Sequence, residues 1–322
     1  MLIENPKTYK GTEAENIFFR PLFCGQSAKD LGIRVIYNLP IPTTVQLWSK
    51  PENVLQSFSS GWNGGSKANK LQKTISMHKV KAESSFAAED YFSMILEKIV
   101  TDSAVNMGDL TGTDLEKAET EMFRQAIAEG VRSTMWIGDV KGEISDLTTF
   151  NGFLRNILDQ NKSLPYALLT LEDDIPDSTI LFRDCWDNAT AELKSLRSEG
   201  ELVYFVSSDV YNRYIEELAA NSNDMSAFNT SDVYSQLNYR GIPIVEVPLN
   251  GYSRNKFSTF SLLTDRRNLV LALNTADMPE NEVRMWYNPD EMENRQRAVF
   301  AIGCEVLDDE LVCAFINEDS GE

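Results

Sequence analysis

The chain has 322 residues, of which 42% are hydrophobic and 10% aromatic, enough to bury the core of one large or two modest domains. Its formal net charge of −19 argues against nucleic-acid binding through the general surface, because duplex binding is driven largely by phosphate neutralisation. No apolar run approaches the roughly 20 residues that span a bilayer, and Met1–Lys7 lacks the basic-then-apolar order of an export signal, so neither membrane insertion nor export is expected.

Histidine and cysteine, the usual carriers of catalysis and metal binding, are few. The four cysteines lack metal-ligand or CxxC spacing and are interpreted as free thiols in a reducing cytoplasm: Cys24, Cys185, Cys304 and Cys313. Any Ser-His-Asp, Cys-His or multi-histidine site would have to use the single His78. No motif surrounds His78, which is interpreted as a surface or subunit-contact residue.

Residues 1–32 are polar and irregular around the short cluster Ile17–Phe23, which is too short and too interrupted by proline to build a core. Two interpretations stay open. The segment is either a loop packed on its own domain or an arm whose aromatic residues, Phe18 and Phe19, pack on a neighbouring subunit.

Two β-rich runs, Ile33–Tyr37 and Thr43–Trp48, lead into a Gly/Ser/Asn-rich tip at 58–66 that contains Trp62. The next stretch, Lys67–Ala82, is predicted to be extended and carries five lysines and no acid: Lys67, Lys70, Lys73, Lys79 and Lys81. This lysine-rich ribbon is either an exposed hairpin that uses lysine to block edge-to-edge aggregation or a long loop lying across an acidic neighbour. An isolated two-stranded ribbon is marginal in water, so it needs a surface to lie on.

Helical periodicity follows. Ala87–Ile99 is predicted to be a helix. A second helix is predicted from Thr113 to about Thr134, roughly 30 Å long, with Thr113 and Glu116 as a capping box. Its predicted apolar stripe comprises Leu115, Ala118, Met122, Phe123, Ala126, Ile127 and Val131.

The middle of the chain alternates helices and a strand. A short helix is predicted within Phe150–Leu158, another over Asp184–Leu196, and a buried strand over Leu202–Ser207. Ser208–Leu218 is predicted to be the next helix, capped by Ser208 or Asp209. Residues 221–235 are rich in Asn, Ser and Asp and are expected to form a surface loop.

Between Gln236 and Ile316 the sequence predicts strands in succession, each bounded by Asn, Asp, Gly or Pro. They are Gln236–Pro248, Leu262–Leu273, Val283–Tyr287, Arg295–Cys304 and Glu310–Ile316. The order of these motifs resembles the closing third of tailed-bacteriophage major capsid proteins of the Hong Kong ninety-seven fold, which encapsulin shells also use. The Phe-Asn-Gly at 150–152 and the strand that runs into the helix at Ser208 resemble the same family, as do the positions of the ribbon and the long helix.

The resemblance implies an α+β fold with an N-terminal arm, an extension loop, a peripheral domain with a long spine helix, and an axial domain. The implied boundaries are 1–44 for the arm and first strands, 45–82 for the extension loop, 83–148 for the peripheral domain, 149–280 for the axial domain, 281–305 for further peripheral strands, and 306–322 for the return to the axial domain and an acidic tail. The implied interface residues of arm and loop are Phe18, Phe19, Trp62, Lys67, Lys70, Lys73, Lys79 and Lys81.

The implied function is that of a major capsid protein of a tailed double-stranded DNA phage or prophage, assembled in the host cytoplasm and located in the virion. Hexamers and pentamers of the chain would form an icosahedral shell. Implied partners are a separate scaffolding protein, a portal, and head-completion or decoration proteins. The shell would enclose DNA without sequence-specific binding, and its acidic inner wall would repel the genome. Some family members join an extension-loop lysine to an asparagine of the next subunit; Lys67 and Lys70 are the positions for such a bond, although no sequence feature marks either.

The acidic residues and glycines do not form a recognisable enzymatic motif. The acidic runs Glu172–Asp174, Glu216–Glu217 and Asp308–Glu310 lack calcium-loop spacing and are interpreted as solvated surface. Gly61–Gly65 lacks the lysine and hydroxyl residue of a phosphate loop. Neither catalytic residues, nor a metal site, nor a cofactor are therefore expected. Two alternatives remain: an encapsulin-type nanocompartment shell and a cytoplasmic metal-dependent α/β enzyme.

Overall fold

The computed structural model describes residues 7–10, 31–37, 43–48, 57, 60, 70–87, 114–142, 147–161, 177–221, 237–247, 249, 259–274 and 282–316. Among these residues, no helix is both long enough and apolar enough to cross a membrane. The helix predicted to begin at Ala87 lies outside this part of the chain apart from Ala87 itself, which ends a strand. Thr113 and the predicted loop after Asn221 also lie outside it.

The larger sheet is built around one long strand, β12, which spans Glu293–Val306. The first part of β12 is flanked by β11 on one side and β5 on the other, and its last part pairs with β10. A parallel strand, β2, and an antiparallel strand, β1, complete the sheet. The bounds are β1 Lys7–Lys10, β2 Arg34–Tyr37, β5 His78–Ala87, β10 Leu269–Asn274 and β11 Glu282–Asn288.

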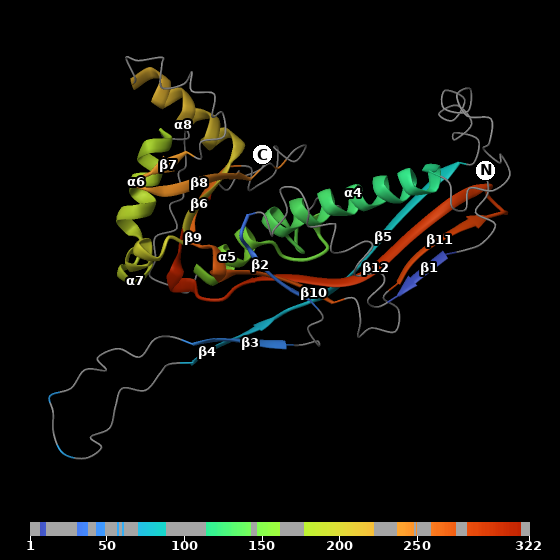
Figure 1. The fold of residues 1–322 in the computed structure, drawn as a ribbon, viewed down its shortest axis with the longest axis horizontal. Helices are drawn as coiled ribbons and strands as arrows, with labels where there is room; N and C mark the ends of the chain where they lie inside the picture. The colour runs from blue at the N-terminus through green and yellow to red at the C-terminus, as the bar shows by residue number, and fades with distance from the viewer. Residues whose placement is uncertain are drawn as a thin grey trace.

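The long helix α4 (Asp114–Ile137) lies along one face of this sheet, as Figure 1 shows. Its 24 residues extend three residues beyond the predicted end. Phe123 and Ile127 are buried and face the sheet, whereas Met122 is 55% exposed. Because Met122 lies about 100° around the helix from Phe123, a single sheet face cannot cover both positions, and the predicted apolar stripe was too wide.

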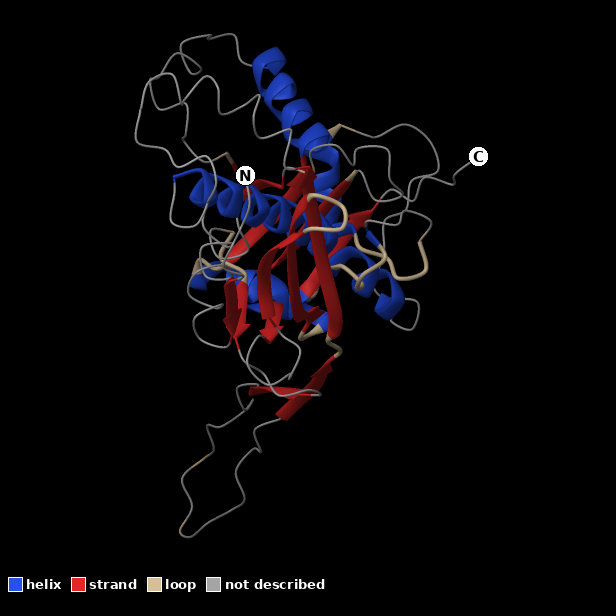
Figure 2. Ribbon diagram, turned by 90° about the vertical axis from the view of Figure 1, so that its right-hand side faces the viewer, coloured by secondary structure: helices blue, strands red, loops and turns tan. Residues whose placement is uncertain are grey.

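A second sheet lies in the other half of the described chain, and Figure 2 shows the helices in blue around the red strands. Its strands run in the order β13-β9-β6-β8-β7, and their bounds are β6 Leu202–Ser207, β7 Asn238–Tyr239, β8 Ile242–Val247, β9 Phe260–Asp265 and β13 Val312–Ile316. All six residues of β6 are buried, which confirms the predicted buried strand. Val203 and Phe205 face the core shared with α4, while Tyr204 and Val206 face the core beneath the helices α6 (Ser178–Asn188) and α8 (Ser208–Asn221).

The helix predicted over Asp184–Leu196 is wrong in extent. Helix α6 spans Ser178–Asn188, and a separate short helix, α7, spans Ala191–Ser195. The break occurs because Thr190 adopts extended backbone angles and its hydroxyl accepts a hydrogen bond from the Leu193 N–H at 3.1 Å. Threonine is a strong helix N-cap, so it starts a new helix rather than continuing the old one. Helix α8 (Ser208–Asn221) begins at the predicted residue.

Trp136, at the end of α4, joins the two halves of the described chain. Its ring lies 5.5 Å from Phe153, 5.2 Å from Phe205 and 5.7 Å from Phe260, measured between ring centroids. Phe153 begins the helix α5 (Phe153–Asn161), which packs against β12. Gly152 precedes α5 where the chain crosses the Trp136 backbone, and a Cβ there would lie 2.6 Å from the Trp136 carbonyl oxygen. That close approach explains the glycine of the Phe-Asn-Gly sequence.

Two strands stand apart from both large sheets. β3 (Thr43–Trp48) pairs antiparallel with β4 (Lys70–Ile75) to form a hairpin, drawn below the larger sheet in Figure 1. The runs Ile33–Tyr37 and Thr43–Trp48 therefore belong to different sheets, since β2 pairs with β10.

Candidate functional site

The base of the β3–β4 hairpin is anchored on its own chain. Val45 and Ile75 are buried against Val270, Ala272 and Leu307. This small apolar cluster lies on the face of β10 opposite the main core, because residues alternate between faces along a strand. This apolar cluster therefore fixes the base of the hairpin to the larger sheet.

Lys73 on β4 supplies a second attachment. Its Nζ donates to Asp309 Oδ1 at 2.8 Å and lies 3.6 Å from Glu305 Oε1. The Gln160 amide of α5 donates to the same Glu305 oxygen at 2.7 Å. Burial raises the pKa of Glu305 above its ordinary value, while Lys73 and Gln160 lower it part of the way back. Lys73 was predicted from sequence as a subunit contact, and the structure shows it bound within its own chain.

The turn between β4 and β5 lies directly on β12. A Cβ added to Gly303 would overlap the carbonyl oxygen of Ser76, which follows β4. Only a residue without a side chain permits this contact, so Gly303 determines where the hairpin leaves the sheet.

Of the other predicted interface residues, Lys79 and Lys81 lie on β5 in the larger sheet rather than in the hairpin, and both are exposed. Lys70 pairs with Trp48 at the end of β4, farthest from β5. Phe18, Phe19, Trp62 and Lys67 lie outside the described residues.

Sequence analysis missed a basic and aromatic group on β11 and β12. Arg284 pairs in register with Arg297, and Trp286 pairs with Arg295, so all four side chains share one face of the sheet. The guanidinium carbons of Arg284 and Arg297 lie 5.4 Å and 5.9 Å from the Trp286 ring centroid, within cation–π range. The alternation of Arg295 and Arg297 with buried residues was the available signal, but it was interpreted only as strand periodicity.

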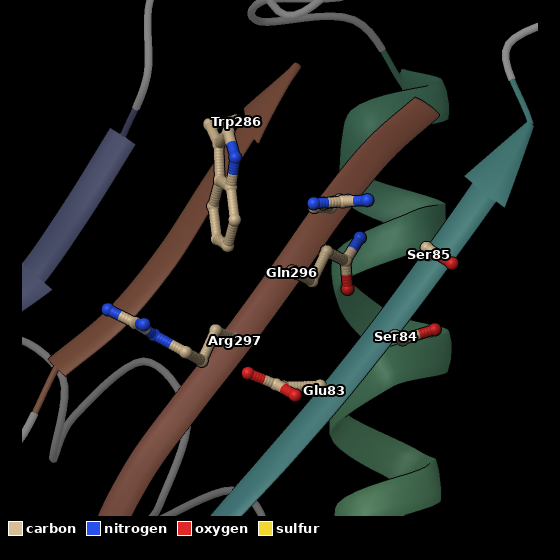
Figure 3. Close-up of a pocket in the computed structure, with 7 residues that line it drawn as sticks. Glu83, Ser84, Ser85, Trp286, Gln296 and Arg297 are labelled. Atoms are coloured by element: carbon tan, nitrogen blue, oxygen red, sulfur yellow. The ribbon is translucent and has the colours of Figure 1, made fainter. Parts of the chain in front are cut away.

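This group borders an open hollow of about 540 Å³ between β11, β12 and β5. Figure 3 shows Arg297 pointing from β12 toward β11, Glu83 pointing from β5 toward β12, and α4 behind the sheet. Arg295 forms ion pairs with Glu291 and, at 3.6 Å, with Glu293. The lining is Glu83, Ser84, Ser85, Trp286, Arg295, Gln296 and Arg297.

Two of the acidic runs have structural roles rather than the predicted solvated ones. Glu217 accepts hydrogen bonds from the Thr179 N–H at 3.0 Å and the Thr179 hydroxyl at 2.7 Å, which caps the first turn of α6. Asp309 binds Lys73, and Asp308 Oδ1 accepts from the Glu310 N–H at 2.9 Å. Within the described ranges, no three His, Cys, Asp or Glu residues are grouped so that they could hold a metal ion.

The described cysteines are free thiols, as predicted. Cys185, Cys304 and Cys313 are buried, and Cys24 lies outside the described residues. The pKa of Cys304 is raised well above its ordinary value, mainly by burial, which disfavours the nucleophilic thiolate. His78 is exposed at the start of β5, in agreement with the predicted surface position.

Comparison by sequence finds nothing related: no protein-family model and no curated protein matches the chain. Comparison by structure finds many similar chains. A chain of the satellite phage P4 procapsid that includes the size determination (Sid) protein has a TM-score of 0.59 and 12% identity, covering 93% of this chain and 89% of that one. A chain from Mycobacterium phage Ogopogo has a TM-score of 0.50 and 11% identity, covering 90% and 91%. These likenesses confirm the fold class predicted from the sequence.

Proposed function

We propose, on the premise that this chain has the Hong Kong ninety-seven fold of phage major capsid proteins, that it is the major capsid protein of a tailed double-stranded DNA phage or prophage. The observation that carries the proposal is the structural match of 93% of the chain to a chain of a procapsid structure. Copies of the chain form hexamers and pentamers of an icosahedral shell.

The shell holds together through many modest contacts. Each subunit touches several others, so contacts that are weak one at a time become strong together. The hairpin base supports this mechanism, because Val45, Ile75 and Lys73 hold the ribbon's root on its own subunit. The connection between β3 and β4, residues 49–69, then reaches a neighbour.

The chain acts as a structural protein rather than an enzyme and is located in the virion. Its partners are a separate scaffolding protein, a portal, and head-completion or decoration proteins. Its acidic inner wall encloses DNA without gripping it, and DNA-binding measurements at low salt test this point: tight binding of duplex DNA by assembled shells would contradict it.

Assembly of the purified chain tests the proposed function. Size-exclusion chromatography and negative-stain microscopy are expected to show pentamers, hexamers or megadalton shells. A variant in which a short turn replaces residues 49–69 should stay folded but fail to assemble. Replacing 223–235 in the same way is the matched control and should leave assembly intact. A wild-type chain that runs only as a small oligomer would overturn the proposal, and shells filled with protein rather than DNA would favour the nanocompartment alternative.

A further inference from the structure

One face of the strands β5, β12 and β11 is not covered by α4. Along β12, Ala298 and Phe300 point into the core with α4. Side chains alternate along a strand, so Arg297 and Val299 point to the opposite face. Lys81 pairs with Val299 and Glu83 with Arg297, which places both β5 residues on that opposite face. They are exposed by 58% and 52%, so this surface, here named the open face, is accessible in the single chain.

The open face is basic in a strongly acidic protein. Among the side chains that the structure describes there, five are cations, Lys79, Lys81, Arg284, Arg295 and Arg297, and three are acids, Glu83, Glu291 and Glu293. The whole chain has the opposite balance, with 30 basic and 49 acidic residues. A basic patch on an acidic protein attracts acidic surfaces. Complementarity to an acidic partner therefore explains this local excess of positive charge.

The open face also contains the residue types that anchor protein interfaces. Trp286 is half-buried beside the hollow of about 540 Å³, and Arg284 and Arg297 lie over its ring. Tryptophan and arginine dominate the energetic centres of protein–protein contacts. The hollow gives carboxylate side chains room to reach the arginines, since the arginines line it from β12.

We propose that the open face binds an acidic surface of a second copy of this chain. The argument for this occupant is charge: a copy with net charge −19 presents mostly acidic surface, and the open face is where such a surface is attracted rather than repelled. This inference rests on the proposed shell, which brings copies side by side.

The lysine-rich ribbon of a neighbour is not the occupant. Within the ribbon, Lys79 and Lys81 lie on the open face itself, and Lys73 is bound to Asp309 of its own chain. The lysines left to reach a neighbour are Lys67 and Lys70. Placing further lysines over Arg284 and Arg297 would set like charges against each other. The ribbon therefore docks elsewhere, and each subunit has two distinct kinds of contact with its neighbours.

Site-specific photo-crosslinking tests the occupant. A benzophenone amino acid replaces Ser85, which is exposed on the open face. The full chain is irradiated after assembly, and crosslinked peptides are identified by mass spectrometry. The expected partner is an Asp/Glu-rich peptide of a second copy. A crosslink to the lysine-rich ribbon, to scaffold or to DNA, or the absence of any crosslink between chains, would overturn the proposal. The same group at Lys141, exposed after α4, is the positional control.

Charge reversal gives a second, independent measurement. The variant K79E/K81E/R284E changes only exposed residues of the open face, so it is expected to keep the wild-type melting temperature. The assembled fraction should fall at least about tenfold, because three attractive charges become repulsive. The control variant K141E/R183E/R213E makes the same change in net charge at two exposed residues and at the half-buried Arg213, all outside the open face, and should assemble within about twofold of wild type. Equal defects in both variants, or none in the first, would refute the inference.

The two proposals fail differently. If the wild-type chain forms no capsomers or shells under any condition, the proposed function fails. If wild-type shells form and the open-face variant assembles normally, only the open-face inference fails.

Discussion

At the scale of single residues, Lys73 shows that a lysine expected at a subunit contact can bind within its own chain. The sequence predicted that Lys73 would contact acidic residues of a neighbouring subunit. In the structure its ammonium group lies beside Asp309 and Glu305 of its own chain. The contact holds β4 against the end of β12 and the turn that follows, so it fixes the root of the ribbon.

Replacing Lys73 with methionine should destabilise the protein. The substitution keeps much of the aliphatic stem but leaves Asp309 and the mostly buried Glu305 facing each other without a cation. The free energy of unfolding should fall by about 1 kcal/mol, the upper end for partly exposed pairs, and amide exchange in β4 should quicken. Lys81→Met is the control, since its pair with Glu83 at 2.8 Å is exposed on both sides and should contribute little. Equal losses in the two variants would contradict a special role for Lys73.

Glu305 should give the stability of the fold a recognisable pH dependence. Because burial raises its pKa in the folded chain, the folded chain binds more protons than the unfolded one between the two pKa values. Its contribution is therefore most favourable below the unfolded pKa of about 4.3 and is lost as pH rises through the folded pKa.

Glu305→Gln removes this titration and retains an oxygen that can accept from Gln160. Denaturant unfolding measured from about pH 4 to about pH 7 should show the variant gaining stability relative to wild type as pH rises. Glu201→Gln, at an exposed position, controls for the loss of one negative charge. A constant difference between Glu305→Gln and wild type across this range would show that Glu305 does not titrate as proposed.

At the scale of elements, two glycines behave in opposite ways. Gly303 in β12 lies against the Ser76 carbonyl, whereas Gly130 in α4 has open space where a Cβ would be. Gly303→Ala should therefore cost about 2 to 3 kcal/mol through steric overlap, and Gly130→Ala should stabilise by about 0.5 to 1 kcal/mol through improved helix propensity. Denaturant midpoints of the two variants measure both effects. A neutral Gly303→Ala would mean that the β4–β5 turn can move off β12 without cost.

The elements that the sequence predicts well are those whose pattern is local. β6 is a run of apolar residues buried on both sides, and α8 starts at a serine followed by helical periodicity. The division of α6 from α7 was missed because Thr190 is a cap only once α7 docks, its hydroxyl also donating to the Glu310 carbonyl 120 positions away at 2.8 Å.

At the scale of the whole molecule, the order of strands and helices was enough to predict the fold class, because topology depends on element order more than on individual contacts. The site was predicted less well. Lys73 and Asp309 are 236 positions apart, and Trp286 meets Arg297 only through the register of β11 and β12. No local pattern carries such pairings, so the charge of the open face could be read only from the structure.

The larger sheet is held together along one long strand, β12, which spans Glu293–Val306. β12 pairs with β5 over ten successive residues, from Glu293 to Ile302, and continues beside β10 to Val306. A pull along the axis of β12 strains all those backbone hydrogen bonds together, whereas a pull across the strand would open them one after another. A container built from this chain would therefore resist stretching most strongly along the direction in which its β12 strands lie, and its walls would be stiffer in one direction than in the other.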